Sequence, residues 1–277
     1  MGRRRGINPW IPNQHGAWPM VTIPPLLGLI LGFCGPGERT AISLLATLLV
    51  LLSWMSGYFC FFAGGLLFKA RRRQHRGTFL APTLTYGGVA ALCAVVALLL
   101  RPSLLWWAIL FVPLVGIAVE EILMNRPRST FSGCATTCAS GAVLAVMDTV
   151  GRGDGGPAGT STVGIISAIV MALYFSGTVP YVKSMIRKKG NRRYLIGSVT
   201  YQVVAALVVA VLALKWVPIL AAIIMVAVMV WSIGRAILVP YSAQKGTVWT
   251  PKRVGRAEVP ATIVMAIAVI LAGVLAA

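Results

Sequence analysis

Two similar clusters of basic residues stand where long apolar segments end. The first runs from Lys69 to Arg73 and the second from Lys183 to Arg187. A guanidinium group binds phosphate or carboxylate oxygens through two parallel hydrogen bonds, and an ammonium group binds them as a point charge. Basic residues at the ends of membrane helices also mark the cytoplasmic side and contact lipid headgroups. The clusters therefore predict either capture of an anionic ligand or a topology signal with headgroup contacts.

Polar side chains beside the first and fourth apolar segments offer other chemistry. Gln14 and His15 precede the first segment, where His15 could titrate or donate a hydrogen bond to an anion. The same two residues could instead hydrogen-bond locally at the start of a helix. Glu121 lies late in the fourth segment, and Arg126 follows it. Because a charge inside the membrane is costly and usually paired, Glu121 predicts either a structural ion pair or a proton or substrate site.

The composition of the segments between these residues requires a membrane as their solvent. Hydrophobic residues make up 58% of the 277 residues and charged residues 11%, whereas soluble domains carry about 25% charged residues. The net charge of +19 would indicate nucleic acid binding in a soluble protein. Here the basic residues lie in short stretches between apolar segments, as in membrane proteins with basic cytoplasmic loops. We therefore expect membrane lipids, and no nucleic acid, as partners.

Nine apolar runs are long enough to cross a bilayer as helices, which takes about 20 residues each. These runs are 17–33, 41–67, 79–100, 104–124, 131–150, 162–182, 194–214, 216–239 and 259–277. The sequence therefore predicts an all-α fold, a polytopic membrane helical bundle that forms a single integral membrane domain over residues 1–277.

The distribution of Lys and Arg predicts the orientation of this bundle. When connections are counted alternately along the chain, 21 of the 25 Lys and Arg fall in the set that includes the amino-terminal stretch, and 4 fall in the other set. The connections rich in Lys and Arg face the cytoplasm. We expect a bacterial plasma (inner) membrane protein with its amino terminus in the cytoplasm and its carboxyl terminus outside. This count places Arg235 in a basic loop.

An internal repeat is indicated by two helices and the basic clusters before them. Residues 79–99 match residues 194–214 at nine of 21 positions, which include the pair Tyr86 and Tyr201, each preceded by Thr. Self-similarity of this kind is typical of proteins built from a duplicated unit. A tyrosine in a membrane helix needs a partner for its hydroxyl group, so the pair could line a cavity or hydrogen-bond between helices.

The repeat predicts how the helices pack. We expect a first repeat over about residues 17–150, a second over about 160–239, and a final helix at 259–277. The second, third, sixth and seventh helices would then surround a pseudo-two-fold axis. Repeat-built membrane proteins usually carry their sites at such an axis, so we expect a central cavity that opens to the cytoplasm.

Two motifs give the chain a resemblance to the YwiC-like family of bacterial membrane proteins. Residues 12–18, Pro-Asn-Gln-His-Gly-Ala-Trp, resemble the opening motif of that family, Pro-x-Gln-His-Gly-Ala-Trp. Residues 177–187, Gly-Thr-Val-Pro-Tyr-Val-Lys-Ser-Met-Ile-Arg, resemble a second block in its sixth helix. With the helix layout, the resemblance covers nearly the whole chain. It implies a membrane bundle but no settled activity.

The helix count, orientation and duplication are also similar to those of the UbiA superfamily of intramembrane prenyltransferases. Those enzymes carry Asp-rich motifs at the cytoplasmic ends of helices 2 and 6, which hold magnesium against an isoprenyl diphosphate. The corresponding stretches here, 58–73 and 174–187, contain no Asp or Glu. Because Mg²⁺ requires oxygen ligands, usually carboxylates, we expect a UbiA-like bundle without metal-dependent transfer, and with no metal or cofactor.

We therefore predict a binding or accessory protein rather than an enzyme, which holds an anionic, phosphate-bearing lipid or isoprenoid in the cytoplasm-facing cavity. The predicted ligand-binding residues are Gln14, His15, Lys69, Arg73, Tyr86, Glu121, Arg126, Lys183, Arg187 and Tyr201. Two alternatives remain open. One is a metal-independent transferase with His15, Glu121 or Tyr201 as acid–base groups, and the other is a small-solute transporter whose two halves alternate access.

Overall fold

Long apolar helices make up most of the chain. The computed structural model describes residues 8–13, 16–70, 73–124, 126 and 129–277, with the backbone alone for residues 73–76, 244 and 251. Within these ranges it contains nine helices long and apolar enough to cross a membrane. They are α1 (Ala17–Cys34), α2 (Ala41–Lys69), α3 (Arg73–Leu100), α4 (Ala108–Leu123), α5 (Thr130–Gly151), α6 (Thr162–Ile186), α7 (Arg192–Trp216), α8 (Ile219–Gln244) and α9 (Pro251–Ala276). Short 3₁₀ helices, η1 (Pro102–Trp107) and η2 (Pro157–Gly159), precede α4 and α6.

These helices confirm the predicted all-α fold and the number of membrane-spanning segments. The largest difference in a boundary is at α9, which begins at Pro251 rather than at residue 259. The Thr250 side chain accepts a hydrogen bond from the Arg253 backbone N–H (3.2 Å), and Pro251 occupies the first helical position. Both features are typical of helix starts. The first turns of α9 carry charged residues, so a search for apolar runs leaves them out.

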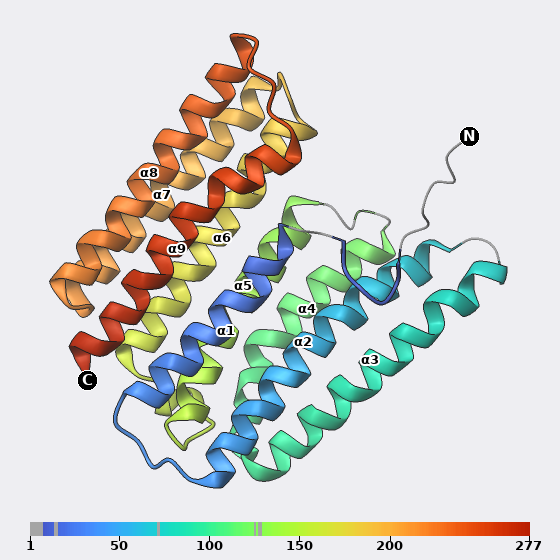
Figure 1. The fold of residues 1–277 in the computed structure, drawn as a ribbon, viewed down its shortest axis with the longest axis vertical. Coiled ribbons are helices and arrows are strands. Elements are labelled where there is room, and N and C mark those ends of the chain that lie inside the picture. The colour runs from blue at the N-terminus through green and yellow to red at the C-terminus, as the bar shows by residue number, and fades with distance from the viewer. Residues whose placement is uncertain (1–7, 14–15, 71–72, 125, 127–128) are drawn as a thin grey trace.

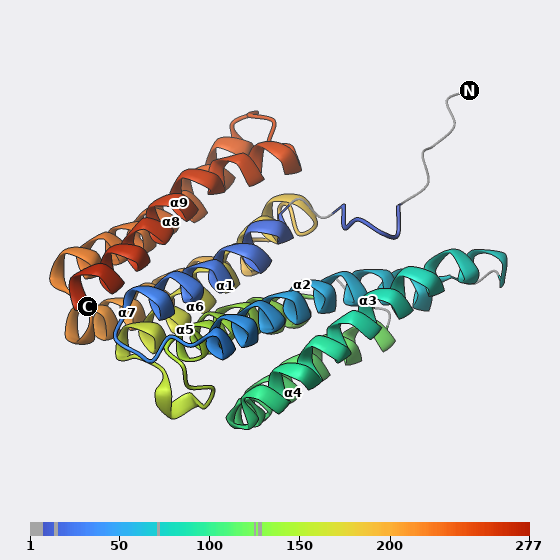
Figure 2. The ribbon, with the colours of Figure 1, turned by 60° about the horizontal axis from the view of Figure 1, so that its bottom comes forward.

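The helices form two groups on either side of α1 and α5 (Figures 1 and 2). On one side, α2 packs closely on α3, and α4 packs on α5. On the other side, α6 packs on α5 and α7, and α8 packs on α7 and α9. The two central helices pack on each other, and α1 also contacts α9. The bundle is therefore joined mainly through α1 and α5.

This arrangement differs from the expected ring of second, third, sixth and seventh helices, and that expectation was wrong. Among the described residues, α2 and α6 make at most a marginal contact, and so do α3 and α7. The physical reason lies in α5, which is rich in Ala, Gly, Ser and Thr and is mostly buried. Small residues let membrane helices approach one another closely on several sides. As a result α5, with α1 against it, occupies the position between the two halves.

Two glycines allow the close packing of α1 on α5. A Cβ atom placed on Gly28 would lie 2.1 Å from the Leu144 carbonyl oxygen, and one on Gly32 would lie 2.7 Å from the Asp148 carbonyl oxygen. Neither position has room for a methyl group. The two glycines form a Gly-x-x-x-Gly pattern, which is common where membrane helices pack at short distance. The backbones of the two central helices therefore touch directly.

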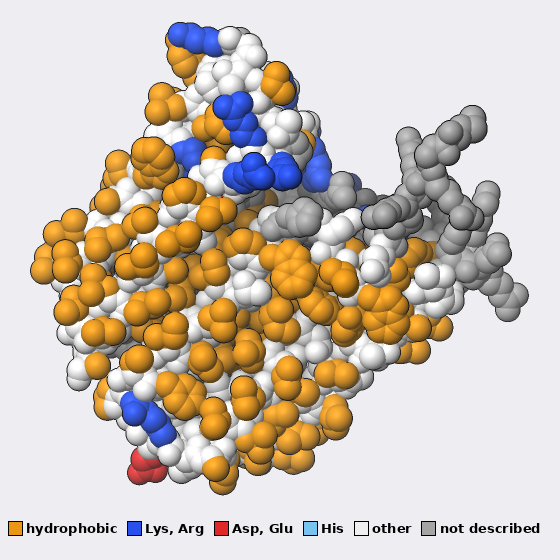
Figure 3. Space-filling view, in the orientation of Figure 1, with side chains coloured by type: hydrophobic (Ala, Val, Ile, Leu, Met, Phe, Trp, Pro, Cys, Tyr) orange, Lys and Arg blue, Asp and Glu red, His pale blue; other side chains and the backbone are white. Residues whose placement is uncertain are grey.

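The molecular surface is apolar over the length of the helices. Figure 3 shows hydrophobic side chains over most of the visible face, with most Lys and Arg side chains in view gathered at one end of the helices. Large apolar side chains such as Leu99, Ile109 and Phe131 are at least 73% exposed. Exposed apolar patches of this extent are not found on soluble monomers. The chain is therefore a multi-pass membrane protein.

Candidate functional site

The predicted ligand-binding residues fall into separate groups. Gln14 and His15 lie outside the described residues, and so does the side chain of Arg73, the first residue of α3. Lys69 is exposed at the last position of α2. Arg126 is exposed beyond the end of α4.

Tyr86 belongs to an aromatic cluster on α3. Its hydroxyl donates a hydrogen bond to the Trp10 carbonyl oxygen (2.9 Å). Its ring lies edge-on to Trp10, with 5.7 Å between ring centroids, and edge-on to Phe59 of α2, with 5.0 Å between centroids. These contacts fasten the segment before α1 to the α2–α3 pair. Tyr86 thus has a packing role that the sequence pattern did not distinguish from a cavity-lining one.

Lys183 lies in a polar cluster on the opposite side of the bundle. Its Nζ atom donates a hydrogen bond to Thr130 Oγ1 (3.1 Å) and lies 5.9 Å from the centroid of the Tyr194 ring. The hydroxyl groups of Thr130 and Tyr194 are hydrogen-bonded to each other (2.9 Å). Glu121 and Arg187 are close enough to act on Lys183 electrostatically. Glu121, near the end of α4, and Arg187, directly after α6, thus both lie within electrostatic reach of Lys183.

The ion pair expected between Glu121 and the arginines after α4 is not formed by the described residues. The Arg126 side chain is exposed, and only its backbone N–H donates to the Glu121 carbonyl oxygen (2.7 Å). One carboxylate oxygen of Glu121 is buried without a hydrogen-bond partner in the described part of the chain. Lys183 is a basic group whose charge acts on Glu121, although the described residues form no salt bridge between the two.

Tyr201 and its neighbours form hydrogen bonds between α5, α6 and α7. The Tyr201 hydroxyl donates to the Leu173 carbonyl oxygen (3.4 Å), and Gln202 Nε2 donates to the Gly177 carbonyl oxygen (3.0 Å). Thr137 and Ser176 share a hydrogen bond (2.7 Å) between their side-chain oxygens. Such bonds hold membrane helices together. The pairing of Tyr86 and Tyr201 in the sequence is therefore not a pairing in space.

An apolar groove lies between α7 and α8, at the ends where the basic residues gather. Its volume is about 310 Å³. It is lined by Leu195, Ile196, Val199, Thr200, Ile237 and Tyr241. Exposed Arg192 and Arg193 stand one helical turn before its first lining residues. Directly after α8, Lys245 Nζ lies 4.6 Å from the centroid of the Tyr241 ring.

A buried ion pair was missed by the sequence analysis. Arg235 is not in a loop but inside α8, where its side chain is only 4% exposed, and Arg235 Nη1 lies 2.5 Å from Glu258 Oε2 of α9. Its guanidinium carbon lies 4.9 Å from the centroid of the Tyr181 ring of α6. A useful signal was present, since Arg235 stands well inside an apolar run and Glu258 is the only acidic residue in the final 100 residues. An ionisable residue in a membrane helix deserves a functional hypothesis.

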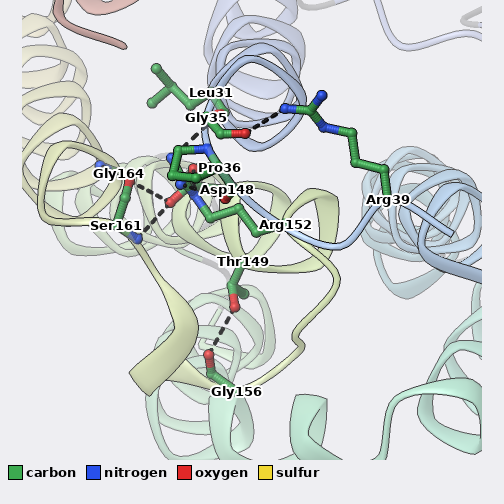
Figure 4. A network of polar contacts seen from close by, with 10 residues as sticks. All are labelled: Leu31, Gly35, Pro36, Arg39, Asp148, Thr149, Arg152, Gly156, Ser161 and Gly164. Atoms are coloured by element: carbon green, nitrogen blue, oxygen red, sulfur yellow. Dashed lines mark hydrogen bonds and ion pairs between the residues drawn. The ribbon is translucent and has the colours of Figure 1, made fainter. Parts of the chain in front are cut away.

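A second buried ion pair lies at the opposite ends of the helices (Figure 4). Asp148 of α5 is fully buried, and its Oδ1 atom accepts from Arg152 Nε (2.9 Å). Its Oδ2 atom accepts from the Ser161 backbone N–H (2.8 Å) and hydroxyl (2.7 Å). Arg152 also donates to the carbonyl oxygens of Pro36 (3.1 Å) and Leu31 (3.4 Å). This network ties the end of α1 and the end of α5 to the start of α6.

The glycine-rich loop beyond α5 is more ordered than expected. A glycine-rich stretch such as residues 151–160 is typical of a flexible, solvated connection, but Gly155 and Gly156 are buried. Thr149 donates to the Gly156 carbonyl oxygen (3.0 Å), and Trp107 Nε1 donates to that of Gly155 (2.9 Å). Hydrogen bonds from neighbouring elements therefore fix this loop, a feature that the loop's composition alone did not reveal.

The described residues do not form a side-chain cluster of the kind that binds a metal ion. Within the ranges that the structure describes, no three His, Cys, Asp or Glu side chains are placed to share an ion. The two ion pairs each consist of one carboxylate and one guanidinium group.

Comparison with known proteins gives a family match and two relatives. The model of the YwiC-like protein family matches residues 11–147, about half of the chain. An uncharacterized protein of Haemophilus influenzae is 26% identical over 213 residues, which are 75% of this chain and 82% of that protein. The uncharacterized protein YwiC of Bacillus subtilis is 25% identical over 209 residues, 74% of this chain and 79% of that protein. No solved structure matches.

Proposed function

Because the chain belongs to the YwiC-like family, whose name carries no activity, we propose its function from the geometry. We propose that it binds an anionic, phosphate-bearing lipid or isoprenoid without metal-dependent transfer. The site is the groove between α7 and α8 rather than a cavity between two repeats. The apolar chain of the lipid or isoprenoid would occupy the groove, and its phosphate would lie among the basic side chains at the groove's end.

The observation that carries this proposal is the position of the cations directly beyond an apolar groove. The groove walls are almost entirely apolar, as an acyl or isoprenyl chain requires. Arg192 and Arg193 precede the groove on α7, and Lys245 follows it directly after α8. Arg binds phosphate oxygens through two parallel hydrogen bonds. Each basic residue near an anionic surface contributes about 1 kcal/mol to binding.

Loss of two cations at the groove should weaken retention of the anionic lipid. For the double variant R192Q/R193Q we expect a loss of about 2 kcal/mol, or about 30-fold in affinity. Native mass spectrometry of protein purified with an anionic phospholipid, an isoprenyl phosphate or a zwitterionic phospholipid measures this. Comparison of the anionic phospholipid with the isoprenyl phosphate shows which of the two the protein prefers. Wild type and R192Q/R193Q should both retain the zwitterionic phospholipid weakly.

Two matched variants separate this site from general attraction of the protein to anionic lipid. The double variant R39Q/K215Q removes the same charge at the other ends of the helices and should retain the lipid as wild type does. I196W fills the groove at an exposed position and should lower retention while leaving every cation in place. Equal losses in R192Q/R193Q and R39Q/K215Q, or full retention in I196W, would refute a specific site.

We also propose that the basic ends of the helices face the cytoplasm, which places the α6–α7 connection inside and the α1–α2 connection outside. Cys34 is exposed at the last position of α1, next to the α1–α2 connection. A membrane-impermeant maleimide should therefore label it in intact spheroplasts. A C34S/K189C variant should be labelled only after permeabilisation, because residue 189 lies between α6 and α7. Labelling of K189C in intact spheroplasts would reverse the orientation.

The transferase alternative gains no support from the described geometry. Tyr201 uses its hydroxyl in a hydrogen bond to the Leu173 carbonyl oxygen, and Glu121 lies near Lys183 at the end of another helix. General acid–base catalysis needs such groups within hydrogen-bond reach of one reacting atom. Binding of an amphiphilic anion therefore accounts for the arrangement with fewer assumptions.

A further inference from the structure

The ion pair of Arg235 and Glu258 places two full charges among membrane helices. Glu258 lies seven residues into α9, about 10 Å along a helix from the end at which the basic residues gather. The Arg235 side chain is 4% exposed and that of Glu258 is 15% exposed. The pair connects α8 to α9, and through the Tyr181 ring it also contacts α6. It is separate from the α7–α8 groove, whose lining residues do not include it.

The carboxylates of the two ion pairs, Asp148 and Glu258, differ in how fully they are hydrogen-bonded. Asp148 accepts three hydrogen bonds, two from Ser161 and one from Arg152. The Glu258 carboxylate pairs with Arg235 alone, and no other described residue donates to its two carboxylate oxygens. Hydrogen bonds to a carboxylate stabilise its charged form. The Asp148 carboxylate therefore has several hydrogen-bond donors, whereas the charge of the Glu258 carboxylate is balanced by a single cation.

The surroundings of Glu258 contain few groups that could replace Arg235. From α6, the phenols of Tyr174 and Tyr181 face the pair, and the Tyr181 hydroxyl is buried with no partner among the described residues. Tyr174 is hydrogen-bonded to Thr262 of α9 (3.0 Å). The other helix that contacts α9 is α1, which contains no acidic or basic residue. Glu258 thus has one cation, two phenols and otherwise apolar neighbours.

We infer that Glu258 is a proton-binding site inside the membrane. Arg235 pairs with its carboxylate until a proton binds. The Glu258 side chain is 15% exposed, so the bundle does not fully enclose the carboxylate. Protonation neutralises the carboxylate, removes the attraction between α8 and α9, and leaves Arg235 without its counter-ion. Since an unpaired charge in this position is costly, protonation should loosen the contact between α9 and the α6–α8 pair.

Infrared difference spectroscopy between acidic and alkaline pH tests this inference, with the whole protein in vesicles of phosphatidylcholine and phosphatidylglycerol. We expect a band of a protonated carboxyl group in apolar surroundings that appears on acidification. The band should be lost in E258Q and kept in E121Q, which removes the half-buried carboxylate of α4, and in D154N, which removes an exposed one. Difference spectra of wild type and E258Q that superimpose would overturn the inference.

A variant of Arg235 tests the role of the ion pair even if E258Q folds poorly. In R235Q the band should persist to a pH at least about one unit higher, because the cation that favours the carboxylate is gone. R235K keeps the positive charge and should titrate close to wild type. If the band has the same pH dependence in R235Q and wild type, Arg235 does not control the proton. Lipid retention at the groove is measured separately, so either proposal can fail alone.

Discussion

The variant D148N should lose about 3–5 kcal/mol of its free energy of unfolding, the typical cost of breaking a buried ion pair from one side. The neutral amide cannot balance the charge of Arg152. It also offers one oxygen, whereas the donors in the wild-type protein bind two. The Ser161 hydroxyl and backbone N–H donate to Oδ2, and Arg152 donates to Oδ1. Chemical unfolding in mixed micelles measures the change.

An exposed aspartate in the same region provides the control for this prediction. Asp154 accepts hydrogen bonds from the backbone N–H groups of Gly155 (2.6 Å) and Gly156 (3.0 Å) through the same oxygen atom. In D154N the amide oxygen can still accept both, so we expect a change within about 0.5 kcal/mol. The double variant D148N/R152Q should lose less than the sum of the single changes, because the two side chains interact directly. A D148N protein as stable as D154N would contradict the proposed network.

The variant G28A should also be strongly destabilised, by about 3 kcal/mol, because it overpacks a contact between two backbones. Its new methyl group would stand 2.1 Å from the Leu144 carbonyl oxygen and 2.8 Å from Met147 Cβ. No side-chain rotation can relieve the first clash, so α1 must move away from α5. The same unfolding measurement reports the loss, and cross-linking between α1 and α5 reports the separation.

A glycine in an open position supplies the matched control. Gly197 lies within α7, and a Cβ atom placed there meets nothing within 4 Å. Because alanine favours a helix over glycine by roughly 0.5–1 kcal/mol, G197A should be neutral or slightly more stable. If G28A is tolerated as well as G197A, α1 and α5 are farther apart in the membrane than the structure places them.

The number and approximate limits of the helices could be predicted because both follow from local hydropathy. Each span must present about 20 mostly apolar residues to the bilayer, whatever its neighbours are. The same rule explains the failure at the end of the chain. The count of basic residues assigned Arg235 to a loop although it lies within the predicted run 216–239, and the start of α9 was omitted because it carries charged residues. Inside the bundle the charges of Arg235 and Glu258 neutralise each other. Pairing of this kind depends on which helices meet, and local hydropathy does not contain that information.

The positions of the helices relative to one another were harder to predict than the helices themselves. The duplicated Thr-Tyr pairs indicated a shared axis, but Tyr86 and Tyr201 bond to different elements on opposite sides of the bundle. The contact between α1 and α5 did have a signal in the sequence, the Gly28 and Gly32 spacing, which the search for charged and aromatic residues did not use. The groove between α7 and α8 had none, because it arises where two apolar surfaces do not fully close.

The central position of α1 has a consequence for the biogenesis of the protein. Its main partner, α5, begins at Thr130, and its other partner, α9, begins at Pro251. At a synthesis rate of roughly 5–20 residues per second, the ribosome needs about 5 s or more to pass from the end of α1 to α5. During this interval α1 waits in the lipid with its glycine face uncovered, while α2 and α3 can already pair. Although α1 precedes the other eight described helices in the chain, it is therefore among the last of them to reach all its final neighbours, and insertion factors have a long opportunity to act on it.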